Sequence, residues 1–337
     1  MESLRILAAP GLRTVARSGW RARLTTALAV VASQPQLWLL GMIGFLLRGG
    51  VVLLLVPIIA LPTQVEARLL IGDYLGSTGF TGTFWSLLAA TAVLASVLIA
   101  AVLWVLARTE IGAFTRLMND PETADQQAFE PARLSRRGRR WLMLRIFGIQ
   151  VLTFVALAAG AAPLASAVGQ MAFAEIVRPS SSASIYARVL AGVGEPLFFF
   201  LVALIVIEIV SALATRELLV GATGWRGRLA SRRLWMLPAV GSALARPVVS
   251  PLRTLGTAAI GWAATAAVLI PSFWAITICW QAVRAAFLTS VGLSDTSEVV
   301  GMLLIALAFS GTFVLSIVVA GFASALRAAL WNLERLR

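Results

Sequence analysis

Long apolar runs recur along the chain, and segments that carry charges separate them. Each run extends over roughly 20 residues, and a helix of that length crosses the hydrocarbon core of a membrane. The runs are continuously apolar and do not alternate, which predicts helices rather than a barrel. We therefore predict an all-α, polytopic membrane protein with six transmembrane helices, at 38–60, 84–107, 142–168, 196–214, 255–279 and 299–323.

The charged segments divide these helices into three helical hairpins. Between hairpins the connecting segments are long and basic, whereas the connections within a hairpin carry few charges. The predicted organisation is a basic cytoplasmic or interfacial segment at 1–35, a hairpin at 36–108, a basic loop at 109–141, a hairpin at 142–214, a basic loop at 215–254, a hairpin at 255–323 and a tail at 324–337.

The distribution of arginine predicts the orientation. The net charge is +13, all 28 basic residues are arginine, and 22 of them lie before residue 38, in 108–141, in 215–254 or after residue 323. The alternate loops hold four. This is the positive-inside pattern, which predicts that both termini are cytoplasmic. Attraction to anionic phospholipids explains the basic character better than nucleic-acid binding does, so we expect the lipid bilayer and no nucleic acid as partners.

Two residue types exclude much chemistry. Histidine is absent, which excludes a Ser-His-Asp triad, a His-ligated zinc site and imidazole acid–base catalysis. Cys279 is the only cysteine, so no intramolecular disulfide can form. No phosphate-binding loop of the Walker type and no dinucleotide glycine fingerprint is present. We therefore predict a protein that is not an enzyme and that has no cofactor. Carboxylates alone are the alternative metal ligands, but the acidic residues are scattered along the chain, so we assign no metal site.

The N-terminal segment has two interpretations. The stretch "LTTALAVVASQ" at 24–34 has an apolar core followed by small residues, as a signal peptide has. Its arginine-bearing leader is long for that role, which favours a segment that lies on the membrane surface.

Several residues recur at a similar interval. Pro57, Pro163 and Pro271 lie late in the first helix of each hairpin, 106 and 108 residues apart, and Glu110 and Glu217 lie 107 apart. A threefold repeat of one hairpin explains the spacing. Three unrelated hairpins of equal length would produce the same period.

Clustered arginines mark candidate contact positions on the cytoplasmic side. Next to Trp141 these are Arg133, Arg136, Arg137, Arg139 and Arg140, and the second basic loop adds Arg232 and Arg233. Such clusters beside a membrane helix anchor it to anionic lipid. Docking of a partner protein or of a phosphoinositide-like head group is the alternative.

Arg48 is the exception to this pattern, because it lies inside the first apolar run in "FLLRGGVVLLL" (45–55). An arginine at the centre of a spanning helix costs about 2.5–3.5 kcal/mol on insertion scales, so it usually faces protein or water. Glu208 in the fourth run lies at a similar depth, within reach of a long arginine side chain. We predict an intramembrane Arg48–Glu208 pair, which either locks helix packing or belongs to a ligand site.

Four stretches together resemble a bacterial group of membrane proteins. They are "LAVVASQPQLWLL", "LARTEIGAFTRL", "RRGRRWLMLRIF" and "ATRELLVGATGWRGRLASRRLW". Their order is similar to that in the membrane domain fused to some glycerophosphodiester phosphodiesterases and in its stand-alone six-helix relatives. The resemblance spans most of the chain, and it implies a polytopic membrane module. The catalytic barrel of those enzymes is missing, so no hydrolase activity is implied.

These observations favour one function and leave a second open. The first is a non-catalytic scaffold or accessory subunit of the bacterial cytoplasmic (inner) membrane, whose arginine-rich face docks lipid, a membrane-protein partner or a second copy of the chain. The second is a transporter for a small solute or lipid, with its site near Arg48 and Glu208. A membrane-embedded lipid enzyme would need an acid–base set that the sequence does not offer.

Overall fold

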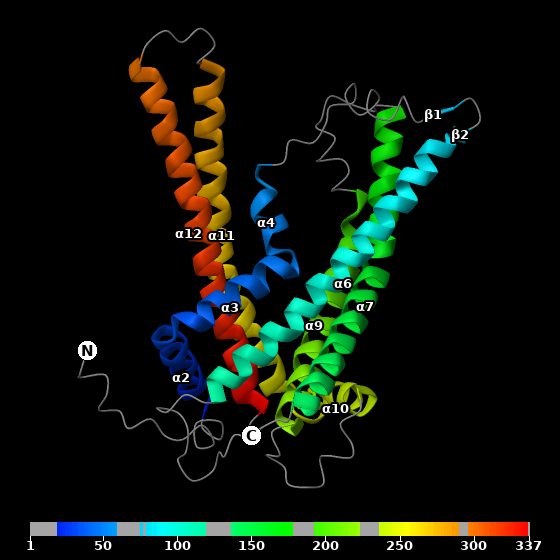
Figure 1. Cartoon of the computed structure of the whole chain (residues 1–337), viewed down its shortest axis with the longest axis vertical. Coiled ribbons are helices and arrows are strands. Elements are labelled where there is room, and N and C mark those ends of the chain that lie inside the picture. The colour runs from blue at the N-terminus through cyan, green and yellow to red at the C-terminus, as the bar shows by residue number, and fades with distance from the viewer. Residues whose placement is uncertain are drawn as a thin grey trace. The chain divides into compact units, whose positions relative to one another are not determined.

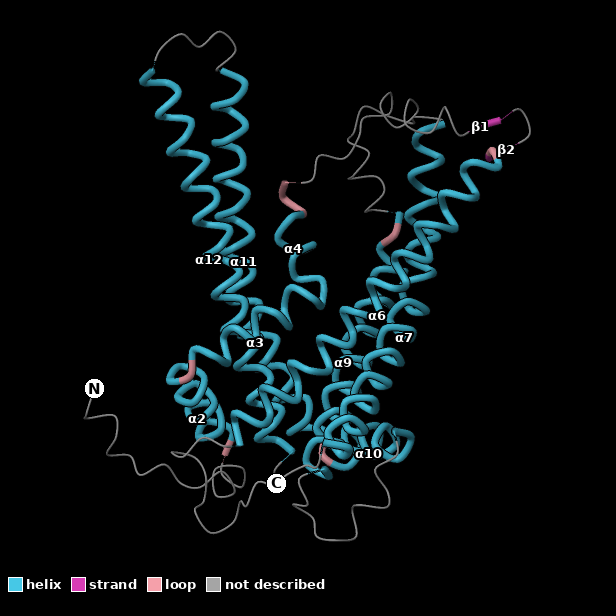
Figure 2. The backbone as a smooth tube through the Cα atoms, in the orientation of Figure 1, coloured by secondary structure: helices cyan, strands magenta, loops and turns pink. Residues whose placement is uncertain are grey.

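The computed structural model describes residues 19–58, 75–76, 79–118, 136–177, 192–222, 236–289 and 296–335. These residues are almost entirely helical (Figures 1 and 2). The exception is one short antiparallel pair, β1 (Leu75–Gly76) with β2 (Gly79–Phe80). The longest helices are α6 (Gly82–Met118), α7 (Arg136–Val177), α9 (Gly194–Ala222), α11 (Pro251–Thr289) and α12 (Thr296–Arg335).

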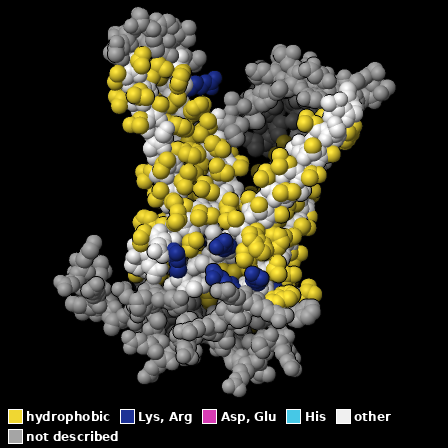
Figure 3. Space-filling view, in the orientation of Figure 1, with side chains coloured by type: hydrophobic (Ala, Val, Ile, Leu, Met, Phe, Trp, Pro, Cys, Tyr) yellow, Lys and Arg dark blue, Asp and Glu magenta, His cyan; other side chains and the backbone are white. Residues whose placement is uncertain are grey.

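Within the described residues, six helical stretches are long and apolar enough to cross a membrane. They are Pro35–Leu55, Gly82–Leu117, Gly138–Met171, Gly194–Gly221, Pro251–Phe287 and Val299–Glu334, and each contains most of one predicted run. Apolar side chains cover the visible surface of the long helices (Figure 3), as lipid contact requires. The chain is a multi-pass, helical membrane protein, and the prediction of six apolar helices is confirmed.

The helices continue beyond the apolar runs into segments that we expected to be loops. The sixth span illustrates the reason. After the apolar run ends at residue 323, α12 keeps a stripe of Leu326, Leu330 and Leu333, spaced for one helix face, and all three are buried. The second basic loop likewise contains α10 (Met236–Val249), which buries Ala239 and Ala243 on one side.

The chain divides into two compact units. The first contains residues Met1–Ile59, Val105–Ile146 and Leu213–Arg337, and the second contains Ala60–Trp104 and Phe147–Ala212. In the first unit α11 packs against α12, and two N-terminal helices, α2 (Trp20–Ser33) and α3 (Pro35–Phe45), also pack on α12. The apolar stretch with the signal-peptide pattern therefore lies in α2, with Ala27 and Val31 fully buried.

A close crossing joins α3 to α12 in the first unit. A Cβ atom at Gly41 would collide with the carbonyl oxygen of Gly321, and one at Gly321 would lie 2.9 Å from the backbone nitrogen of Met42. Only glycine lets the two backbones approach this closely. Beside the crossing, Trp38 packs edge-on against Phe322, with their ring centroids 5.2 Å apart.

The first span is broken immediately after α3. A wide π-helical turn, η2 (Leu46–Gly50), separates α3 from the short helix α4 (Val51–Leu55), and the helix axis changes direction there (Figure 2). Gly49 has φ +88°, the one positive φ among the described residues. A residue with a Cβ rarely adopts this conformation, so the Gly49–Gly50 pair allows the break.

The second unit contains the remaining parts of α6, α7 and α9. The Thr153 hydroxyl on α7 and the Ser211 hydroxyl on α9 form a hydrogen bond of 2.8 Å. Trp104 on α6 packs edge-on against Phe147 on α7, with ring centroids 5.7 Å apart. The helix α7 continues through Pro163, as α11 in the first unit continues through Pro271.

Candidate functional site

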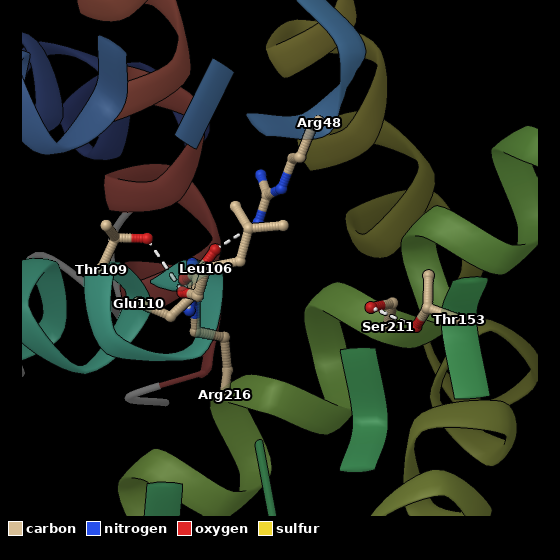
Figure 4. Close-up of polar contacts among 7 residues, drawn as sticks. All are labelled: Arg48, Leu106, Thr109, Glu110, Thr153, Ser211 and Arg216. Atoms are coloured by element: carbon tan, nitrogen blue, oxygen red, sulfur yellow. Dashed lines mark hydrogen bonds and ion pairs between the residues drawn. The ribbon is translucent and has the colours of Figure 1, made fainter. Parts of the chain in front are cut away.

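Glu110 on α6 lies at the centre of a charged cluster in the first unit (Figure 4). Arg48, from the π-helical turn, donates through Nη2 to Oε1 of Glu110. Arg216, on α9, donates through Nη1 to the other carboxylate oxygen, Oε2, at 2.5 Å. One carboxylate therefore pairs with guanidinium groups from two other helices, and we call these three residues the Glu110 cluster.

The three side chains of the Glu110 cluster differ in exposure. Glu110 and Arg216 are buried, with 9% and 4% of their side-chain surface exposed, whereas Arg48 is 45% exposed. A buried carboxylate is tolerated only when charges and hydrogen bonds compensate for its lost hydration, and the two arginines provide both. Arg48 thus belongs both to the buried cluster and to an accessible surface.

Glu110 and Arg216 each lie among buried apolar residues of their own helix. On α6, Leu106, Ile111 and Phe114 surround the position of Glu110 in the sequence, and all are less than a tenth exposed. On α9, Leu213 and Leu218 flank Arg216 and are 1% exposed. The sequence therefore places each charge within a stripe that must face protein, which fixes the helix rotation that brings Glu110 and Arg216 together.

A fourth charge lies near the Glu110 cluster. Arg327 on α12 is within electrostatic reach of both Arg48 and Glu110. Its guanidinium lies over the ring of Trp262 on α11, 4.8 Å from the ring centroid, in a cation–π arrangement. The carboxylate of Glu110 therefore interacts electrostatically with three arginines, and each arginine comes from a different helix other than α6.

A second buried ion pair joins the two ends of the described chain. Arg23 on α2 donates to Oε2 of Glu334 near the end of α12, and the Thr257 hydroxyl on α11 donates to the same oxygen at 3.3 Å. The Arg23 and Glu334 side chains are 10% and 5% exposed. The pair holds α2, α11 and α12 together, and it places the first and last described helices side by side.

A pocket lies beside the Glu110 cluster. It is lined by apolar groups of α3, α6 and α12 together with a few polar residues, namely Leu37, Leu40, Gly41, Gly44, Arg48, Thr109, Glu110, Ala113, Leu117, Ser324, Ala325, Ala328, Ala329 and Asn332. The pocket has about 30 Å³ of space for the centres of water molecules, which holds roughly two of them. It is partly open, so a bound group can extend beyond it.

Some buried polar atoms of this region make no hydrogen bond within the part of the chain that the structure describes. They are Nε of Arg23, Oγ1 of Thr215, Nε of Arg216, Oγ1 of Thr254 and Oδ1 of Asn332. Asn332 is 2% exposed and lines the pocket. A buried polar atom without a hydrogen-bond partner is energetically costly. Water or a ligand in the pocket can donate a hydrogen bond to Oδ1 of Asn332.

The structure describes some of the site residues predicted from the sequence, and others lie outside the described residues. Arg48 is in an ion pair, but its partner in the structure is Glu110. Glu208 belongs to α9 in the second unit, and the Arg48–Glu208 pair stays a prediction. Arg139 and Arg140 are exposed on α7, beside the exposed Trp141. Arg136 and Arg137 begin the same helix, while Arg133, Arg232 and Arg233 lie outside the described residues.

Sequence reasoning did not assign Glu110, Arg216, Arg23 or Glu334 to a site. Glu110 was noted only for its spacing from Glu217, because it lies beyond the apolar run of the second helix. A signal was nevertheless present. Ile111, Phe114 and Leu117 continue the apolar face of that helix past Glu110, which indicates burial of the segment.

The described residues contain no group of three or more histidine, cysteine, aspartate or glutamate side chains that could hold a metal ion. The chain matches no protein family, no curated protein and no solved structure. The structure itself is therefore the basis for a functional proposal: a multi-pass membrane protein with two ion-pair clusters and a small pocket beside one of them.

Proposed function

We propose that this chain is a non-catalytic scaffold or accessory subunit of the bacterial cytoplasmic membrane, and that its arginine-rich side docks anionic lipid or a partner protein. The observation that carries the proposal is the Glu110 cluster. Both carboxylate oxygens accept hydrogen bonds from arginines of other helices, so the charges act as ties between helices. Acid–base catalysis needs a group free to gain and lose a proton, and Glu110 is engaged on both sides.

The second ion pair supports the same interpretation. Arg23, Thr257 and Glu334 connect three helices through one carboxylate oxygen, again with both charges buried. Each of the two carboxylates thus connects helices within the first unit, as expected of charges that serve packing. The predicted orientation would present Arg139, Arg140 and the neighbouring arginines to the cytoplasmic head groups, where each basic residue contributes about 1 kcal/mol of attraction to anionic lipid.

Site-specific photocrosslinking in intact cells tests the docking role. A photoreactive phenylalanine replaces Arg139 or Arg140, both exposed on α7, and in the control it replaces Leu303, an exposed position on the apolar surface of α12. A scaffold predicts a discrete protein adduct from the arginine positions and only lipid adducts from Leu303, which lies on the apolar surface. Equal, diffuse labelling at all three positions would argue against a docking face.

Transport is the second candidate, because the first span is broken at Gly49 beside a half-exposed arginine. Broken helices and intramembrane charges occur at the binding sites of transporters. Proteoliposomes with fluorescent phospholipids distinguish the two functions for a lipid substrate. A scaffold predicts that lipid crosses the bilayer no faster than in protein-free vesicles. Faster crossing that Arg48→Gln abolishes would replace the scaffold with a lipid transporter.

A further inference from the structure

The Glu110 cluster has more positive than negative charge. Arg48 and Arg216 share a single carboxylate, which leaves one net positive charge, and Arg327 adds to the positive potential at Arg48. Surplus charge in a low-dielectric region is unfavourable, and an anion placed against it relieves the repulsion. The electrostatics of the cluster therefore favour a negatively charged ligand.

Two members of the cluster, Arg48 and Glu110, line the pocket, and Arg48 is the accessible one of the two. Arg48 is 45% exposed, and Glu110 accepts from its Nη2 nitrogen. A guanidinium has five N–H donors, so several remain after this bond, and their planar arrangement matches two oxygens of a phosphate or carboxylate. Arg216, by contrast, is 4% exposed and serves only the interior.

The walls of the pocket restrict the ligand further. Leu37, Leu40 and Leu117 form an apolar lining, and the hydroxyl of Ser324 and the side chain of Asn332 are polar points on it. A free carboxylate metabolite or inorganic ion gains little from apolar walls in a membrane. A phospholipid matches both features, because its phosphate is anionic and the adjacent glycerol and acyl groups are apolar.

We propose that this pocket binds a phosphate group through Arg48, presented by a phospholipid whose acyl chains lie along the apolar wall. Free phosphate is the other source of the same chemistry. The small enclosed space receives the phosphate oxygens or a water that bridges to Asn332, and the open side leaves room for the rest of the lipid. The scaffold role does not depend on this binding, and the binding does not depend on the scaffold role.

Titration of the delipidated full-length protein, followed by native mass spectrometry, tests the proposal. The probes are dioctanoyl phosphatidylglycerol, dioctanoylglycerol (the same tails without phosphate) and inorganic phosphate. The variants are Arg48→Gln and Arg284→Gln, which remove the same charge from the pocket and from an exposed position of α11 outside the arginine-rich loops. We expect Arg48→Gln to weaken phosphatidylglycerol binding at least about tenfold, as loss of a charged hydrogen bond does, and Arg284→Gln to leave it unchanged.

The other probes identify the source of the phosphate. Binding of phosphatidylglycerol without binding of inorganic phosphate assigns the site to a lipid, and binding of both assigns it to a phosphate from either source. Equal binding of dioctanoylglycerol and phosphatidylglycerol would overturn the proposal. Equal weakening by Arg48→Gln and Arg284→Gln would also overturn it, because net charge alone would then explain the binding.

A second variant keeps the test decisive if Arg48→Gln does not fold. Ala328→Leu fills the pocket from α12 and leaves the Glu110 cluster intact. We expect it to weaken phosphatidylglycerol binding at least about tenfold. Its thermal unfolding midpoint should equal that of the parent protein within measurement error. Unchanged affinity in Ala328→Leu would contradict binding in this pocket.

Discussion

At the scale of single residues, Glu110 connects three helical segments of the first unit. Its side chain and that of Arg216 are both nearly inaccessible, so neither charge has water as an alternative partner. Arg48 is different, because its half-exposed guanidinium keeps contact with the surroundings. Loss of the carboxylate should therefore cost far more than loss of Arg48, since it leaves two guanidinium groups facing each other without an anion.

Replacement of Glu110 by glutamine tests this ranking. Breaking a buried pair by removing one partner costs about 3–5 kcal/mol, so Glu110→Gln should unfold at a clearly lower temperature than the parent protein. The measurement is thermal unfolding in mild detergent, followed by tryptophan fluorescence. Glu195→Gln, which removes an exposed carboxylate at the start of α9, is the control and should unfold at the parent temperature. A Glu110→Gln midpoint equal to that of the control would refute the ranking.

The sequence predicted Arg48 as a site residue but did not point to Glu110. The charge within an apolar run was evident, because burial of an arginine needs compensation whatever the fold. The partner was sought at equal depth along straight helices. The π-helical turn at Leu46–Gly50 changes the direction of the first span, and an arginine side chain reaches several ångströms from its Cα. Hydropathy predicts neither the π-helical turn nor the direction in which the Arg48 side chain extends from it, so it does not identify the carboxylate that pairs with Arg48.

At the scale of elements, glycines determine where helices approach and where they bend. Gly41 and Gly321 allow α3 and α12 to touch along their backbones, and Gly49 allows the break that follows. The two uses are physically distinct. One removes a side chain from a crowded contact, and the other supplies a backbone conformation that other residues avoid.

Alanine at Gly41 should separate α3 from α12. The added Cβ would overlap the carbonyl oxygen of Gly321 and lie 2.9 Å from the backbone nitrogen of Ala325, neither of which can rotate away. Overpacking of this kind costs about 1–3 kcal/mol, visible as a lower midpoint of thermal unfolding. Gly44→Ala, one turn further along α3, meets only the Ser324 hydroxyl at 4.0 Å and should be neutral. Equal effects at the two positions would show that the crossing is looser than described.

Alanine at Gly49 tests the bend separately, because nothing lies within 4 Å of a Cβ placed there. Its cost is conformational, about 1–2 kcal/mol for a left-handed residue. Gly311→Ala on α12 also has open space around the Cβ but an ordinary helical backbone, so it should be neutral or slightly stabilising. Thermal unfolding of the two variants side by side gives the comparison. A neutral Gly49→Ala would mean that the first span can continue as a regular helix.

Helix existence was predictable at this scale, and helix ends were not. An apolar run of 20 residues sums many small transfer energies into a strong signal, so all six spans were located. Beyond each run the signal is a stripe of three or four residues, such as Leu326, Leu330 and Leu333, mixed with arginine. Tertiary packing on other helices, which hydropathy does not report, decides whether such a segment is helical.

At the scale of the whole molecule, orientation in the membrane follows from the arginine distribution and awaits measurement. The positive-inside prediction assigns 119–135 to the cytoplasm and 178–191 to the opposite side. Since Cys279 is the single cysteine, replacing it with serine gives a background without thiols. Ser181→Cys should then react with a membrane-impermeant maleimide in intact cells. Ala128→Cys should react only after permeabilisation, and the reverse result would invert the whole arrangement.

The central claim is that Glu110 and Arg216 tie helices together, and a double-mutant cycle tests it most directly. The variants are Glu110→Leu, Arg216→Met and their combination, measured as thermal unfolding midpoints and free energies in one detergent. The claim predicts that the double variant is more stable than Glu110→Leu alone, with a coupling energy of about 1–3 kcal/mol, because the buried cation is removed together with its anion. Additive losses, with the double variant the least stable of the three, would contradict it.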